Sequence, residues 1–119
     1  MSELSVITKS KKLMEYILTI TKKSDVKYRF TFVNKMHNLC MEIIENLYSA
    51  NFTKLGSEKR NEYQVHVQAK LHYLDFVCEM AKNANCITMH QYSFIAKNIL
   101  ECINLLCGWM KSDSSRVNL

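Results

Sequence analysis

The amino-acid sequence predicts an all-α protein, specifically an antiparallel up-down-up-down four-helix bundle. The 119-residue chain contains no proline and only two glycines, which leaves few positions for the tight turns that many short strands need. Apolar residues recur at steps of three and four in four separate stretches, and this is the spacing of one helix face. The length suits a single hydrophobic core, so we expect one domain over residues 1–119.

The first two helices are predicted over about residues 4–23 and 28–55. The first is amphipathic, because its apolar residues share one face and its lysines lie between them on the other side. We expect the second to end near Gly56, since glycine readily takes the left-handed conformation that closes a helix. Its apolar stripe consists of Val33, Met36, Cys40, Ile43, Leu47 and Ala50.

The third and fourth helices are predicted over about residues 58–82 and 89–111. Ser57 is a suitable N-cap for the third helix. Thr88 and Gln91 have the spacing of a capping box before the fourth. The tail, residues 112–119, is polar and lacks periodicity, so we expect it to be flexible. The stripes read Tyr63, Val67, Leu71, Leu74, Cys78 and Ala81, then Tyr92, Ile95, Ile99, Cys102, Leu106 and Trp109 or Met110.

The cysteines indicate a reducing compartment. Their number, five, is odd, and the chain has neither a signal peptide nor an apolar run long enough to cross a bilayer. We therefore expect a cytoplasmic protein with free thiols and no membrane partner. Cys40, Cys78 and Cys102 lie on apolar stripes and are expected to be buried, whereas Cys86 falls in a loop.

No pattern in the sequence indicates catalysis. A carboxylate-bridged metal site in a bundle needs Glu-x-x-His pairs, and no glutamate of this chain has a histidine at that spacing. There is no Cys-x-x-Cys pair, and the two glycines do not form a phosphate-binding loop. We predict that the protein is not an enzyme, with no catalytic residues, no metal and no cofactor.

The positive charge is confined to one end of the chain. Residues 1–35 contain eight lysines and arginines against three acids, whereas the remaining residues balance at eight against eight, so the first segment carries the whole net charge of +5. Such a segment suits contact with an anionic partner such as nucleic acid. A solvated, lysine-rich helix face is the alternative.

Within this segment, the cations around the first turn are the best candidates for nucleic-acid contact. Tyr28 and Phe30 are interleaved with them, so phosphates could pair with the cations while a ring stacks on a base. A weaker basic set on the third helix includes Arg60. The candidate nucleic-acid-binding residues are Lys22, Lys23, Lys27, Arg29, Lys35 and Arg60.

The second helix carries more apolar surface than one stripe requires. A large exposed apolar patch is uncommon on a monomer, so the surplus predicts oligomerisation. The residues off the main stripe are Phe30, Phe32, Leu39, Ile44, Tyr48 and Phe52.

Four short motifs resemble those of the Avd-like four-helix bundle proteins, the accessory variability determinants of diversity-generating retroelements. The resemblance covers residues 5–112, in order and with similar helix lengths. Gly108 and Trp109 look like a packing signature that ends the fourth helix. The motifs are Lys27-Tyr28-Arg29-Phe30, Ala50-Asn51-Phe52, Leu71-His72-Tyr73-Leu74 and Cys107-Gly108-Trp109-Met110-Lys111.

The resemblance implies a homopentameric barrel of bundles that binds RNA or DNA and partners a reverse transcriptase in mutagenic reverse transcription. It implies no catalytic residues, and by position it favours Arg29, with Lys27 and Lys35 beside it, as a nucleic-acid contact. A related set of bundle proteins, encoded in intervening sequences of ribosomal RNA genes, shares the fold without a retroelement link. The alternative function is therefore a stand-alone protein-interaction scaffold that docks partners through the apolar surplus.

Overall fold

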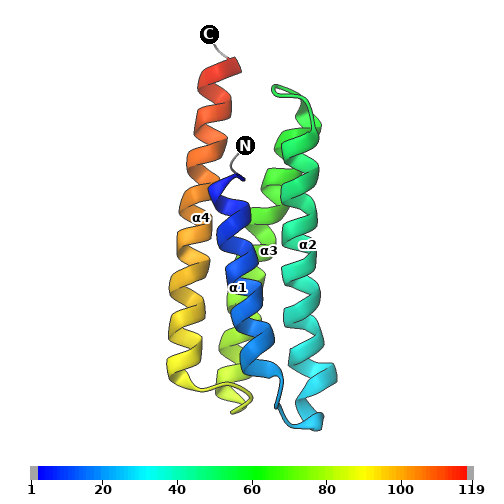
Figure 1. Ribbon diagram of the computed structural model, residues 1–119, viewed down its shortest axis with the longest axis vertical. Coiled ribbons are helices and arrows are strands. Elements are labelled where there is room, and N and C mark those ends of the chain that lie inside the picture. The colour runs from blue at the N-terminus through cyan, green and yellow to red at the C-terminus, as the bar shows by residue number, and fades with distance from the viewer. Residues whose placement is uncertain (1–2, 118–119) are drawn as a thin grey trace.

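The computed structural model describes residues 3–117, and within them every regular element is helical. The long helices are α1 (Ser5–Thr21), α2 (Asn34–Phe52), α3 (Glu58–Asn83) and α4 (Met89–Val117), and they form an elongated bundle of 52 × 25 × 22 Å. Extensive contacts join α1 to α2, α2 to α3, α3 to α4 and α4 to α1. Consecutive helices run in opposite directions along the long axis (Figure 1). None of the helices in this range is long and apolar enough to cross a membrane.

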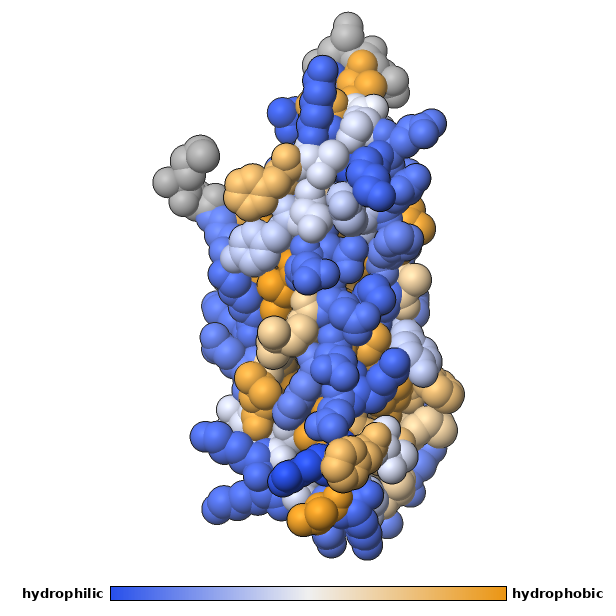
Figure 2. All heavy atoms as spheres, turned by 90° about the vertical axis from the view of Figure 1, so that its right-hand side faces the viewer, coloured by the Kyte–Doolittle hydropathy of each residue, from blue (hydrophilic) through white to orange (hydrophobic). Residues whose placement is uncertain are grey.

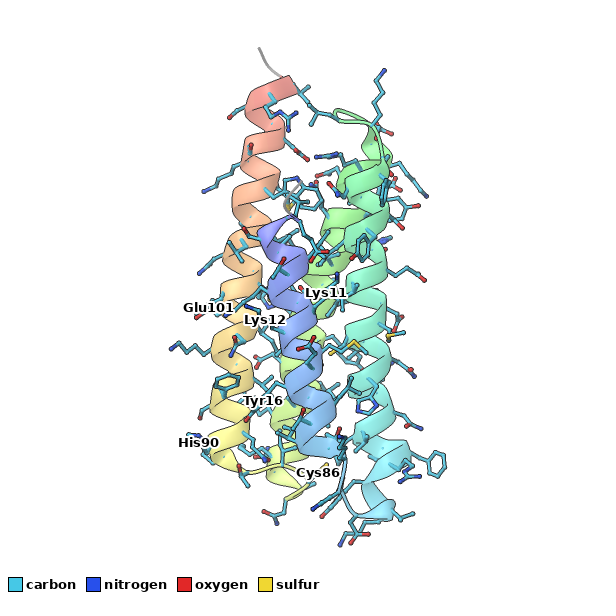
Figure 3. The ribbon with its side chains drawn as sticks, in the orientation of Figure 1. Lys11, Lys12, Tyr16, Cys86, His90 and Glu101 are labelled. Carbon is cyan, nitrogen blue, oxygen red and sulfur yellow. The ribbon has the colours of Figure 1, made fainter. Side chains whose placement is uncertain are left out.

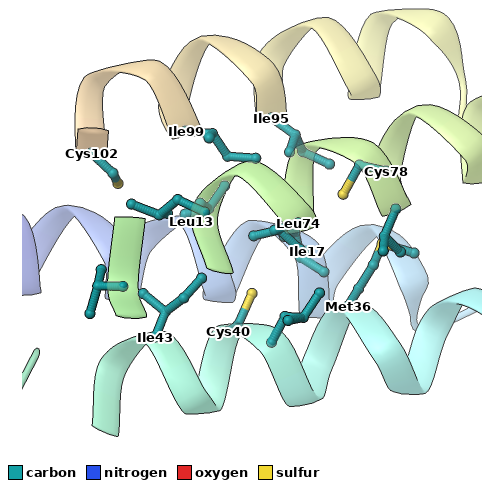
Figure 4. Packing of buried hydrophobic residues seen from close by; sticks show 14 of the residues in the cluster. Leu13, Ile17, Met36, Cys40, Ile43, Leu74, Cys78, Ile95, Ile99 and Cys102 are labelled. Carbon is teal, nitrogen blue, oxygen red and sulfur yellow. The ribbon is translucent and has the colours of Figure 1, made fainter. Parts of the chain in front are cut away.

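The core is built from the predicted stripes. Figure 4 shows how Leu13 and Ile17 of α1 meet residues of the other three helices in the interior. Burying an aliphatic side chain of this size contributes about 1.5–3 kcal/mol. The fully or nearly fully buried residues include Ile7, Ile17, Met36, Ile43, Leu47, Val67, Leu71, Leu74, Ile95, Ile99 and Leu106.

Cys40, Cys78 and Cys102 are buried in the core, as predicted, and their thiols are free. Burial raises the pKa of Cys40 to about 12, and it raises the pKa of Cys78 and Cys102 as well. These thiols therefore stay protonated and act as small apolar groups. Cys86 and Cys107 are partly exposed.

The predicted N-caps of the third and fourth helices are confirmed. The backbone N–H of Arg60 donates to Ser57 Oγ at 3.2 Å. In the capping box the N–H of Gln91 donates to Thr88 Oγ1 at 3.0 Å, and the N–H of Thr88 donates to Gln91 Oε1 at 2.9 Å.

The second helix differs from its predicted range at both ends. It is preceded by a 3-10 turn, Val26–Tyr28, and a π-helical turn, Arg29–Val33, and it ends at Phe52 because Thr53 is extended. Gly56 does take a left-handed conformation, with φ of 90°, but in the α2–α3 connection rather than at the helix end. A regular period of three and four does not reveal a π turn, which contains one extra residue.

The prediction of a flexible tail is wrong for residues 112–117. α4 continues to Val117, so Gly108 and Trp109 lie inside the helix and do not end it. A Cβ added at Gly108 would meet nothing within 4 Å, so no close approach requires glycine there. Residues 118–119 lie outside the described range. The extension follows from Asp113, seven residues after Leu106 and therefore on the same inner face, where it is buried.

Asp113 is held by a polar cluster where the apolar stripes end. Arg60 donates to both of its carboxylate oxygens, at 2.7 and 2.9 Å, and Gln64 Nε2 donates to Oδ2 at 2.9 Å. A third bond from Arg60 reaches the Thr53 carbonyl at 3.1 Å, and the guanidinium lies 5.1 Å from the Trp109 ring centroid. α4 and the α2–α3 connection extend beyond the start of α1 at this end (Figure 1), so three helices share the cluster.

The electrostatics of the cluster favour the charged carboxylate. Burial alone would raise the pKa of Asp113, but the hydrogen bonds from Arg60 and Gln64 outweigh it and lower the pKa below the usual 3.8. The stabilisation is therefore complete above about pH 4 and is lost as pH falls through the lowered pKa.

Replacement of Asp113 by asparagine is expected to lower the free energy of unfolding near neutral pH by about 3 kcal/mol, because it leaves Arg60 buried without a counter-charge. Urea denaturation followed by circular dichroism measures this change. The variant should also lack the part of the acid destabilisation that begins near pH 4 in the wild type.

The matched control is Glu101→Gln, which removes the partner of Lys9 in a partly exposed ion pair and should change the urea midpoint much less. An Asp113→Asn variant as stable as the wild type would show that the cluster does not hold the end of α4.

Candidate nucleic-acid interface

The structure brings five of the six predicted contact residues to one end of the bundle. Lys22 and Lys23 follow α1, Lys27 and Arg29 lie in the short turns before α2, and Lys35 is in the first turn of α2. All five are exposed. Within residues 3–117 none of them forms an ion pair, so their charges are open to solvent. We call these five residues the basic turn.

The local fold fixes the basic turn to the body of the protein. Asp25 caps the 3-10 turn, with Oδ1 accepting from the N–H of Lys27 at 3.3 Å. Tyr28 reaches across to the α3–α4 connection, where its hydroxyl donates to the Ala84 carbonyl at 2.7 Å. Its ring lies 6.3 Å from that of Phe32, which packs on the core. The cations are therefore carried by anchored backbone rather than by a free loop.

The lysines of α1 have a different environment. Lys9 pairs with Glu101 of α4, and Lys11 pairs with Glu3 at 2.7 Å and lies over the Tyr48 ring. Figure 3 shows Lys11 on the side of α1 toward α2 and Lys12 on the side toward α4. Since Lys9 and Lys11 are neutralised within the chain, the basic turn holds five of the six remaining cations of residues 1–35, and the sixth is the exposed Lys12 of α1.

Arg60, the sixth candidate, is not part of this surface. It lies at the start of α3, at the opposite end of the bundle from the α1–α2 turn (Figure 1), and it is only 8% exposed. Its donors are occupied by Asp113 and Thr53. The expectation that Arg60 contacts nucleic acid does not fit this placement, because a phosphate would have to displace a buried carboxylate.

Exposed aromatic side chains adjoin the basic turn. Phe30 is 83% exposed, and Tyr73 and Phe76 of α3 stack on each other with ring centroids 6.0 Å apart. Lys35 Nζ lies 5.3 Å from the Tyr73 ring centroid. These four side chains line a shallow cavity of about 290 Å³, together with Thr31, Phe32, Val77 and Met80. Figure 2 shows hydrophobic side chains gathered beside strongly hydrophilic ones where α2 begins.

The sequence pattern does not connect Tyr73 and Phe76 with the basic turn. Its one signal is that both residues lie off the buried stripe of α3, beside Leu74 and Val77. Their position opposite Phe30 depends on the register between α2 and α3, which a single sequence does not reveal. We call Phe30, Tyr73 and Phe76 the aromatic platform.

Few opposing charges lie at this end. Asp25 is engaged as a cap, and Asp75 accepts a hydrogen bond from the Tyr92 hydroxyl at 3.0 Å. Glu79 is exposed on α3, one turn beyond Phe76. His37 adds no positive charge near neutral pH, since burial lowers its pKa and its Nε2 lies 2.9 Å from Thr21 Oγ1. The electrostatic balance of the surface is therefore cationic.

The described part of the chain contains no group of three or more histidine, cysteine, aspartate or glutamate side chains that could hold a metal ion. The arrangement offers cations and planar rings instead. Such a surface can bind polyanions that carry stacked or stackable bases.

Comparison with known proteins places the chain in a family. A search of curated protein sequences found no match. The sequence does match the bAvd-like family over residues 5–113, which includes all four long helices up to the buried Asp113. This range agrees with the extent of the resemblance seen in the sequence, and it includes the basic turn and the aromatic platform. The chain therefore belongs to the bAvd-like family.

Proposed function

We propose that the protein is a non-enzymatic, oligomeric accessory protein that binds nucleic acid through the basic turn and partners a reverse transcriptase in a diversity-generating retroelement. The retroelement role and the polymerase partner rest on membership of the bAvd-like family. The observation that carries nucleic-acid binding is the cluster of five exposed cations, unpaired within residues 3–117, on anchored backbone. Counterion release from the bound strand would supply most of the affinity.

Oligomerisation, in the family's case as a pentameric barrel, is supported by apolar surface outside the core. Of the surplus residues on the second helix, Leu39 belongs to the core and Phe32 packs against it, but Phe52 is 85% exposed. Further large apolar side chains are exposed on α3 and α4, among them Val65, Phe94 and Leu100. Surface of this kind is typical of interfaces between subunits.

The second candidate function is a protein-interaction scaffold of the intervening-sequence type with no retroelement role. The exposed residues Leu100 and Leu105 of α4 favour it, because they lie in the middle of that helix and not at the end that carries the basic turn. Capture of a protein partner in nuclease-treated solution, by a chain that does not bind RNA or DNA, would support the scaffold over the accessory role.

The affinity for a labelled oligonucleotide is expected to fall steeply with salt. If each of the five cations contacts one phosphate of a single strand, each contact contributes about −0.7 to the slope of log affinity against log salt concentration. The expected slope is therefore about −3 to −4. The triple variant Lys27→Ala, Arg29→Ala, Lys35→Ala should bind more weakly and show a slope shallower by about 2, since each lost contact removes one term. Fluorescence anisotropy measures both quantities.

The control for this experiment is Lys54→Ala, Lys97→Ala, Lys111→Ala, which removes the same charge from exposed positions outside the basic turn. It should leave the slope close to that of the wild type. Equal losses of affinity in the two triple variants would show that only the net charge matters and not the basic turn. If the wild type showed no affinity for the oligonucleotide at low salt, the proposed nucleic-acid contact would be ruled out.

The mass in solution tests the assembly independently of nucleic acid. Light scattering at micromolar concentration should give about 70 kDa, five times the 14.0 kDa of one chain. A monomeric mass would contradict both the exposed apolar surface and the pentamer proposed from the family.

A further inference from the structure

We infer that the nucleic acid recognised at this end of the bundle is single-stranded, with its bases stacked on the aromatic platform of Phe30, Tyr73 and Phe76. This inference rests on the proposed nucleic-acid binding and adds the class of ligand. It follows from three features of the surface, which are the exposure of the rings, their relation to the cations, and the charge of the chain.

The first feature is the exposure of the rings. Phe30 is 83% exposed, Phe76 52% and Tyr73 46%, although apolar side chains of this size are normally covered in a monomer. Phe30 stands on the π-helical turn, where Val33 is buried and Phe32 packs on the core while Phe30 does not. The backbone thus presents Phe30 outward beside the paired rings of α3, with all three around one shallow cavity.

The second feature is the proximity of a cation to the rings. Lys35 Nζ lies 5.3 Å from the Tyr73 ring centroid, and Lys35 lines the same cavity as Phe30 and Phe76. A single strand offers a phosphate and an unstacked base within the same nucleotide, so both can be engaged at once. A duplex buries the faces of its bases inside the helix and offers only phosphates to such a surface. The combination of rings and cations therefore favours the single strand.

The third feature is the positive charge of the chain, which decides whether a second copy of the protein could cover the rings instead of a nucleic acid. A second copy of this chain could also cover apolar rings, but beside these rings every copy presents the exposed cations of the basic turn. Of the eleven acids, five are already paired within the chain, namely Glu3, Glu42, Glu62, Glu101 and Asp113. Placing the basic turn of another copy against Lys35, which lines the cavity, and the adjoining cations would bring like charges together. An anionic strand with planar bases complements both the cations of the basic turn and the rings of the aromatic platform. The exposed Glu79 of α3, near Phe76, opposes such a strand with a single negative charge.

The test compares a 20-nucleotide single strand of mixed sequence with the duplex of the same sequence, using fluorescence anisotropy at low and moderate salt. The double variant Phe30→Ala, Phe76→Ala should lose about tenfold or more in affinity for the single strand, on the scale of one stacked base per ring. Its affinity for the duplex should change less than about twofold. Because both side chains are exposed, the variant should keep the wild-type circular dichroism spectrum and melting temperature.

Two further variants separate base stacking from a general loss of exposed apolar surface and from an apolar contact with protein. Met41→Ala, Val117→Ala removes two apolar side chains that are also more than half exposed, 59% and 52%, from positions outside the aromatic platform, and should bind the single strand as the wild type does. Phe30→Leu, Phe76→Leu keeps an apolar surface without planar rings. It should bind the single strand as weakly as the alanine variant, whereas an apolar protein interface would be largely restored by leucine.

The outcomes distinguish the inference from the proposed function. If Phe30→Ala, Phe76→Ala binds the single strand normally while the triple variant Lys27→Ala, Arg29→Ala, Lys35→Ala does not, the proposed nucleic-acid binding is supported and the inference of base stacking is wrong. If the wild type binds the duplex as tightly as the single strand, the inference is also overturned. A change in oligomeric mass caused by Phe30→Ala, Phe76→Ala would assign the platform to a subunit interface. Absence of binding to either ligand would remove both the inference and the proposed function.

Discussion

The structure depends on the burial of one narrow apolar stripe per helix. Steps of three and four residues place each stripe on a single helix face, and two neighbouring helices cover it. The interior is consequently filled by aliphatic residues and protonated thiols, and the lysines and arginines, Arg60 apart, are directed outward. What remains for function is the surface that the stripes do not use, and this surface differs between the two ends of the bundle.

At one end the stripes become polar before the helices stop. Arg60 and Gln64 precede Val67 on the stripe of α3, and Asp113 follows Leu106 on that of α4. Because α1 does not extend this far, a hydrogen-bonded ion pair lies where α1 would otherwise contribute apolar side chains. At this end the buried charges of Arg60 and Asp113 are therefore satisfied by each other within the protein.

At the other end the charges are not satisfied. The chain passes from α1 to α2 through two irregular turns, and Tyr28 and Asp25 hold them in place. The cations of the basic turn, Phe30 of the π-helical turn and the rings of α3 then share one surface. The two ends of the bundle thus use charged residues differently. At one end the ion pair of Arg60 and Asp113 stabilises the fold, and at the other the cations of the basic turn are exposed to a ligand.

Local spacing in the sequence is sufficient to predict the four helices, the N-caps of α3 and α4 and most of the core. It did not reveal the π turn before α2, whose extra residue breaks the period, or the last turns of α4, where the inner residue is an aspartate rather than an apolar one. The pairing of Arg60 with Asp113 cannot be predicted from local spacing either, because the two residues are 53 positions apart. The aromatic platform depends on the register of two helices, and only the three-dimensional structure brings Phe30 next to Tyr73 and Phe76.

If nucleic acid binds at the α1–α2 end of the bundle, photochemical cross-linking should locate it there. A single strand containing 5-bromouracil, irradiated with the full-length protein and digested, should form adducts on peptides that contain Phe30, Tyr73 or Phe76 and the adjoining cations. Adducts confined to the outer faces of α1 and α4, or to the Arg60 and Asp113 end, would contradict binding at the basic turn.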